Sequence, residues 1–206
     1  MTPPAPFDAE GDFDVAVLGG GLPAEVEALI RDAGLIRQDR DRALPLLMEA
    51  RALAPRHPAT LIALYRFHFY GHDLRAAREV AWASLRVARE AIVSGAPEDR
   101  PCDDELVLSA PITDEQARFD PSVRFYLFTL KGLAYLSLRL GDLDLGRRAL
   151  QVLQTLDPQD RVGGAVLAQV LARAEAGLLD DDDDDDSTVL HPQASAAPSP
   201  RGWSTP

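Results

Sequence analysis

Apolar residues recur at three- and four-residue spacing in several stretches of the chain, and this spacing predicts amphipathic helices. The first stretch, residues 24–36, has Val26 and Ile30 on the same helical face. A second stretch continues the spacing and ends before Pro55, a residue that cannot continue a helix without a clash. We therefore predict an antiparallel helical hairpin over residues 24–55.

Two further hairpins are predicted by the same pattern, at residues 58–93 and 122–157. The segment between them, residues 94–121, contains four prolines and many acidic residues and breaks the helical spacing. We interpret this segment as an insertion, which is either a degenerate repeat or a long loop. A last apolar stretch at residues 161–177 predicts a helix that caps the exposed end of the stack.

The ends of the chain have a different composition from its middle. Residues 1–22 are acidic and rich in proline and glycine. Residues 180–206 begin with seven aspartates and continue with proline, serine and alanine. Neither segment has enough apolar residues to pack, so we expect two flexible tails around a helical domain at residues 23–179.

Matching residues stand 34 and then 69 positions apart, and 69 is two steps of 34 plus one. A 34-residue period is typical of stacked helical hairpins, each of which buries its apolar face against its neighbours. The four matching sets are Ile30, Leu64 and Leu133; Asp39, Asp73 and Asp142; Ala43, Ala77 and Gly146; and Leu53, Val87 and Leu156.

The third hairpin has Leu133-Ala134 on its first helix, Gly141-Asp142 at its turn and Asp157-Pro158 at its end. With this motif the chain resembles the tetratricopeptide repeat family. The resemblance implies an all-α fold of antiparallel hairpins stacked as a short right-handed solenoid with a C-terminal capping helix. The chain is also similar to a group of small bacterial proteins with such repeats from nitrogen-fixation gene neighbourhoods.

The family resemblance implies a protein–protein interaction module or assembly accessory that binds its ligand in a concave groove lined by first helices. The corresponding positions combine aromatic rings with cations, which suits an extended peptide that carries carboxylates. The alternative is that the rings fill the repeat core and that the cations are ordinary surface residues. The predicted groove residues are Ile62, Arg66, Phe69, Tyr70, Phe128, Lys131, Tyr135 and Arg139.

Two other functions compete with this interpretation. The segment from Gly19 to Ala24 matches the glycine-rich fingerprint of dinucleotide-binding enzymes, and Asp39 follows at a suitable distance. That fold needs a parallel sheet, whereas the residues that follow have helical spacing. The other alternative is a scaffold that self-associates through its end helices.

Charge and cysteine content narrow the class of partner. Asp180 to Asp186 supply seven of the negative charges in a net charge of −12, which leaves −5 for the rest of the chain. A mildly acidic body favours neither nucleic acid nor an anionic membrane surface. The single cysteine cannot form an internal disulfide, and no apolar run reaches the roughly 20 residues that span a bilayer. We expect a cytoplasmic, non-enzymatic protein with a protein or peptide partner and no catalytic residues, cofactor or metal.

Overall fold

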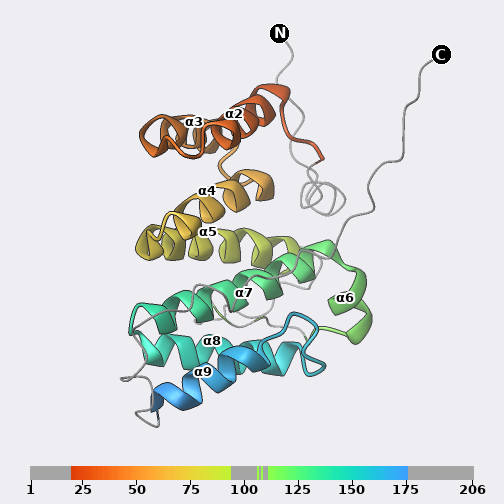
Figure 1. The fold of residues 1–206 in the computed structure, drawn as a ribbon. Coiled ribbons are helices and arrows are strands. Elements are labelled where there is room, and N and C mark those ends of the chain that lie inside the picture. The colour runs from red at the N-terminus through yellow and green to blue at the C-terminus, as the bar shows by residue number, and fades with distance from the viewer. Residues whose placement is uncertain (1–19, 94–105, 107, 109–110, 176–206) are drawn as a thin grey trace, which may run out of the picture. The chain divides into compact units, whose positions relative to one another are not determined.

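The computed structural model is helical throughout the part of the chain that it describes (Figure 1). The predicted all-α class is therefore confirmed for that part. Of the two predicted tails, only residues 20–22 are among the residues that the structure describes. The described residues are 20–93, 106, 108 and 111–175.

The chain divides into two compact units, Met1–Ala172 and Arg173–Pro206. The first unit contains almost all of the described residues, and of the second the structure describes only the last helical turn. No helix in the described part is long and apolar enough to span a lipid bilayer.

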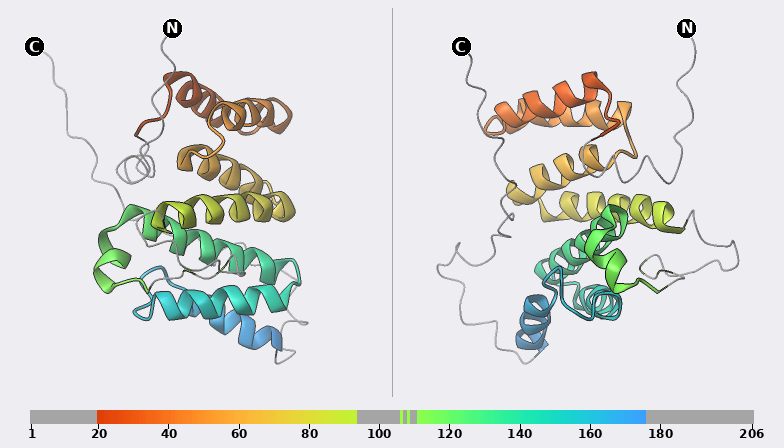
Figure 2. Two further views of the ribbon diagram at one scale, coloured as in Figure 1. Left: turned by 180° about the vertical axis from the view of Figure 1, so that it is seen from behind. Right: turned by 90° about the vertical axis from the view of Figure 1, so that its right-hand side faces the viewer.

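Consecutive helices pair through short turns and run antiparallel (Figures 1 and 2). Each pair also contacts the next, because α3 packs on α4 and α5 packs on α7. A short helix, α6 (Asp114–Phe119), lies in the predicted insertion and packs on α7, and α9 (Ala165–Glu175) follows the last pair. The three pairs are α2 (Ala24–Leu35) with α3 (Arg40–Leu53), α4 (Pro58–Tyr70) with α5 (Leu74–Val93), and α7 (Pro121–Arg139) with α8 (Leu143–Leu156).

An aspartate begins the second helix of every pair. The carboxylates of Asp39, Asp73 and Asp142 each accept a hydrogen bond from the backbone N–H three residues later, at 3.3, 3.1 and 3.3 Å. These bonds satisfy N–H groups that have no partner inside the helix. The aspartates that recur along the sequence are therefore the N-caps of α3, α5 and α8.

A small buried residue follows each capping aspartate by four positions. Ala43 and Ala77 have no exposed surface, and Gly146 is also buried. A Cβ atom added at Gly146 would lie 2.5 Å from a methyl carbon of Leu138, so the glycine lets α8 approach α7 closely. The small residue of each set lies where the two helices of a pair pack together.

The buried side chains form two clusters that meet at α4. Leu64 of α4 belongs to the smaller cluster, which joins α2, α3 and α4. Leu61 of α4 belongs to the larger cluster, which extends through α5, α7 and α8 to Leu167 and Leu171 of α9. Helix α4 is therefore the element that connects the first pair to the rest of the fold.

Neighbouring pairs are also joined by arginines near the start of each second helix. Arg40 of α3 donates a hydrogen bond to the carbonyl oxygen of Phe67 at the end of α4, at 3.1 Å. Arg78 of α5 forms an ion pair of 3.2 Å with Asp142 in the turn between α7 and α8. Each arginine thus holds the turn of the next hairpin in place.

Candidate functional site

A pocket between the helices, here called the apolar pocket, has a volume of about 610 Å³. Helices α4, α5, α6 and α7 all contribute to its walls, and most of its lining is aliphatic or aromatic. A pocket of this size and composition suits apolar side chains or a small apolar ligand. The lining residues are Ile62, Tyr65, Ala81, Ser84, Arg118, Phe119, Pro121, Arg124, Phe125, Phe128 and Thr129.

Two arginine and phenylalanine pairs lie in the lining of the apolar pocket. The guanidinium carbon of Arg118 lies 5.1 Å from the ring centre of Phe119, and that of Arg124 lies 5.6 Å from Phe128. Phe119 is 68% exposed and Phe128 is 47% exposed, which is high for rings of this size. The pocket therefore presents apolar surface together with two cations, and each cation can donate paired hydrogen bonds to a carboxylate.

Local sequence explains why α6 and α7 begin where they do. Thr113 and Gln116 form a capping box at the start of α6, in which each side chain accepts the backbone N–H of the other, at 3.2 and 3.0 Å. Asp120 then caps α7 by accepting the backbone N–H groups of Ser122 and Val123, at 2.9 and 3.1 Å. This short helix and its turn place Phe119 beside the pocket.

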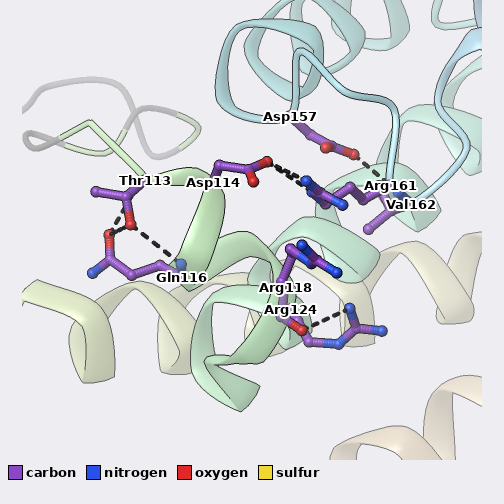
Figure 3. A network of polar contacts seen from close by, with 8 residues as sticks. All are labelled: Thr113, Asp114, Gln116, Arg118, Arg124, Asp157, Arg161 and Val162. Atoms are coloured by element: carbon purple, nitrogen blue, oxygen red, sulfur yellow. Dashed lines mark hydrogen bonds and ion pairs between the residues drawn. The ribbon is translucent and has the colours of Figure 1, made fainter.

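A contact from a distant part of the chain ties α6 to the loop between α8 and α9 (Figure 3). Arg161, in the loop between α8 and α9, donates from Nε to the carboxylate of Asp114 at 2.9 Å. The same loop is ordered by Asp157, which accepts the backbone N–H of Val162 at 2.9 Å. Arg161 and Asp114 therefore position one wall of the apolar pocket, although neither lines it.

A row of aromatic rings extends from the apolar pocket between α4 and α7. The ring of Phe69 lies 5.7 Å from that of Tyr65, 5.5 Å from that of Tyr70 and 5.7 Å from that of Tyr135. Burial, together with the smaller effects of the neighbouring Tyr135 and Tyr70, raises the pKa of Tyr65 to about 12. The Tyr65 hydroxyl therefore stays protonated at neutral pH.

The structure divides the eight predicted groove residues among three places. Ile62 and Phe128 line the apolar pocket. Phe69, Tyr70 and Tyr135 form part of the aromatic row, and Arg66 and Arg139 each lie 5.9 Å from a tyrosine ring of this row.

Lys131, the eighth predicted groove residue, is engaged elsewhere. Its ammonium donates a hydrogen bond to the carbonyl oxygen of Val162 at 2.7 Å. Burial lowers the pKa of Lys131, and the carboxylate of Asp160 opposes that shift. Lys131 thus fastens α7 to the loop between α8 and α9.

A second pocket, here called the arginine pocket, lies between α4 and the first hairpin and has a volume of about 550 Å³. Three arginines line it: Arg37 in the turn after α2, Arg40 of α3 and Arg66 of α4. No acidic residue is found among its described lining residues. These are Ile30, Ala33, Gly34, Arg37, Gln38, Arg40, Leu47, Ala63, Arg66, Phe67 and Tyr70.

The glycine turn lies directly before α2. Gly21 has a φ of +71°, and the carbonyl oxygen of Gly20 lies 3.0 Å from Nε2 of the buried His57. His57 also caps α4, because its Nδ1 accepts the backbone N–H of Ala59, so its Nε2 is the protonated nitrogen that donates to Gly20. The structure describes no strand beside this turn.

His68 and His72, which are four residues apart in the sequence, do not lie on one helical face. His72 lies beyond α4 with a φ of +58°, whereas His68 is inside the helix. Burial lowers the pKa of His68, partly opposed by Asp73, whose carboxylate lies 3.6 Å from its Nδ1. Across the described residues there is no group of three or more histidine, cysteine, aspartate or glutamate side chains that could hold a metal ion.

Sequence reasoning did not identify Arg118, Phe119 and Arg124 of the apolar pocket or Arg37 and Arg40 of the arginine pocket. The first three follow the Thr-x-x-Gln pattern of a capping box, which is a usable signal for a helix inside the insertion. The other two lie in and just after a predicted turn, and no local motif distinguishes them from surface arginines.

Comparison with known proteins places this chain among relatives. No protein-family profile and no solved structure matches it. A protein of Azotobacter chroococcum mcd 1, named as an uncharacterized 19.8 kDa protein in the nifW 5' region, is 35% identical over 133 residues. The match covers 65% of this chain and 71% of that protein. The chain therefore belongs to the same family as the uncharacterized 19.8 kDa protein of the nifW 5' region.

Proposed function

We propose that this protein is a binding module for a partner polypeptide, built as a short stack of tetratricopeptide-like hairpins. The apolar pocket receives an apolar side chain of the partner. The observation that carries the proposal is this pocket of about 610 Å³, with two large exposed rings and two arginines in its lining. Its function is binding, and no reaction forms part of it.

The energetics favour an apolar anchor from the partner. Burial of one Leu or Phe side chain in such a pocket contributes roughly 1.5–3 kcal/mol. The exposed parts of Phe119 and Phe128 would be covered at the same time. Arg118 and Arg124 would hydrogen-bond carboxylates beside the anchor, because their guanidinium groups border the same pocket. Aromatic residues and arginine are also the side chains that most often dominate binding at interfaces.

The repeat-like construction supports the tetratricopeptide-like part of the proposal. The three helix pairs begin their second helices with the same capping aspartate, at the spacing typical of that family. The name of the Azotobacter relative places its gene in the nifW 5' region. We therefore propose an accessory role in assembly, and the first partners to test are proteins encoded beside the gene for this chain.

The test is affinity capture of those candidate proteins by the intact chain and by the variant Phe119→Ser/Phe128→Ser. The matched control is Leu53→Ser/Val166→Ser, which changes two apolar residues of similar exposure, 49% and 47%, outside the apolar pocket. All three proteins must first give the same helical circular dichroism.

A partner that binds the intact chain and the control, but not the pocket variant, supports the proposal. Equal capture by all three proteins refutes the apolar pocket as the binding site. If no candidate binds and sedimentation shows that the chain self-associates, the scaffold alternative replaces the proposal.

A further inference from the structure

We propose that the arginine pocket is a second contact site for the same partner, and that it binds the carboxylates of an acidic segment next to an apolar residue. This inference rests on the proposed function, because it assumes a polypeptide partner. The inference adds a second site, on the other flank of α4, and it states the chemistry of the segment that occupies this site.

The guanidinium groups of the arginine pocket are partly fixed before any ligand binds. Arg40 donates to the carbonyl oxygen of Phe67 at 3.1 Å, and its guanidinium carbon lies 4.2 Å from the centre of the Phe67 ring. Arg66 lies 5.9 Å from the ring centre of Tyr70. A guanidinium held by a ring and a carbonyl loses less freedom when it binds a carboxylate, which favours recognition at this place.

Two acidic side chains close in sequence to this pocket have other partners. Asp39 caps α3 and forms an ion pair with Arg42, and Asp32 pairs with Arg31 at 3.2 Å. Since no acidic residue is among the described lining residues, the charge of the three arginines is not balanced within the pocket. Charge complementarity therefore selects an anionic occupant.

The surroundings of the arginines favour a polypeptide over a small free anion. Aliphatic and aromatic side chains such as Ile30, Leu47 and Phe67 share the lining with the arginines. Tyr70, which is one of the lining residues, is 60% exposed. An inorganic anion would leave this apolar surface uncovered, whereas an acidic residue followed by an apolar one would use both features.

Both pockets lie on α4, so one extended segment can reach them together. Ile62 and Tyr65 of α4 line the apolar pocket, whereas Arg66 and Tyr70, within two turns of them, line the arginine pocket. A partner whose apolar anchor enters the first pocket therefore brings its neighbouring residues close to the second.

The experiment selects peptides from a phage-displayed random library on the full-length chain and measures their affinity by fluorescence anisotropy. The test variant is Arg37→Gln/Arg66→Gln, which removes two exposed guanidinium groups and leaves Arg40 in its structural contact. The matched control, Arg75→Gln/Arg173→Gln, makes the same change in charge at exposed positions that line neither pocket. The Phe119→Ser/Phe128→Ser variant reports on the apolar pocket, and circular dichroism verifies the fold of each protein.

We expect the selected peptides to be enriched in aspartate and glutamate. We also expect their affinity to fall about tenfold or more in the test variant and to change little in the control, in line with the loss of charge-assisted hydrogen bonds. Selected peptides without acidic enrichment, or an equal loss in the test and control variants, overturn the inference.

The variants also separate failure of this inference from failure of the proposed function. Peptides that depend on Phe119 and Phe128 but not on Arg37 and Arg66 overturn the arginine pocket as a contact site and leave the proposed function intact. Peptides with the opposite dependence support the arginine pocket and refute the apolar one. Failure to select any peptide overturns both.

Discussion

Replacement of Gly71 by alanine tests how the first hairpin is fastened to α4. Gly71 follows the last residue of α4, and a Cβ added there would overlap the guanidinium of Arg40. Its backbone has a φ of −88°, which alanine adopts without strain, so the overlap is the only obstacle to the larger residue. The guanidinium is the end of a flexible side chain, and we expect it to move aside while the helices stay in place.

The cost follows from what Arg40 loses when it moves. Its hydrogen bond to Phe67 at 3.1 Å contributes about 1.5 kcal/mol, the low end for a charged donor, because Arg40 is exposed. The contact with the Phe67 ring at 4.2 Å adds about 0.5 kcal/mol. Alanine restricts the unfolded chain and returns about 0.4–1 kcal/mol. The expected net loss of stability is therefore about 1 kcal/mol.

The sign of the effect should reverse when Arg40 is absent. In an Arg40→Ala background the overlap no longer exists, so Gly71→Ala should stabilise the protein by about 0.4–1 kcal/mol. The free energy of unfolding of the four proteins is measured by urea titration with circular dichroism detection. A loss of equal size in both backgrounds would refute the steric argument.

Three further predictions follow from other contacts. Asp73→Ala should lower the free energy of unfolding by about 1 kcal/mol through loss of a helix cap, and Asp142→Ala should lower it more because its ion pair with Arg78 is also lost; urea titration compares them. Burial lowers the pKa of His68 in the folded state, so the unfolded chain protonates this imidazole more readily, and the free energy of unfolding should fall as pH drops through about 6.5. In His68→Gln, the free energy of unfolding should depend less steeply on pH. Because the pKa of Tyr65 is raised to about 12, the folded protein keeps a proton that the unfolded chain loses near pH 10, so the free energy of unfolding should decrease above that pH. The decrease should be smaller in Tyr65→Phe, and tyrosinate absorbance should show a late-titrating tyrosine that this variant lacks.

The starts of the second helices could be read from the sequence because capping is a local interaction. Asp39, Asp73 and Asp142 each bond a backbone group only three residues away, so the residue type and its spacing carry the whole signal. The all-helical class followed from apolar spacing in the same way. Burial was less predictable: Leu53 is 49% exposed and belongs to neither core cluster, although its counterpart Val87 is buried.

The candidate site depended on contacts that join distant parts of the chain. Lys131 matched a groove position by its spacing, yet it bonds to Val162, a residue 31 positions later. The wall of the apolar pocket that α6 provides is held by Asp114 and Arg161, which are 47 positions apart. Helical periodicity says which face of a helix is apolar but not which later loop returns to it, so neither contact could be predicted.

The small size of α6 has a consequence for how tightly a partner would bind under the proposed function. The helix has six residues, of which only Ala117 is buried, whereas the adjoining α7 buries many more. Elements with so little buried surface open locally at a much lower free energy than the core. Under the proposed function, a partner would meet a population in which the Phe119 wall is in place only part of the time, and its apparent affinity would be the intrinsic affinity multiplied by the fraction of molecules with the wall in place. The ion pair of Asp114 and Arg161 would then help to determine how often the apolar pocket is complete, although neither residue lines it.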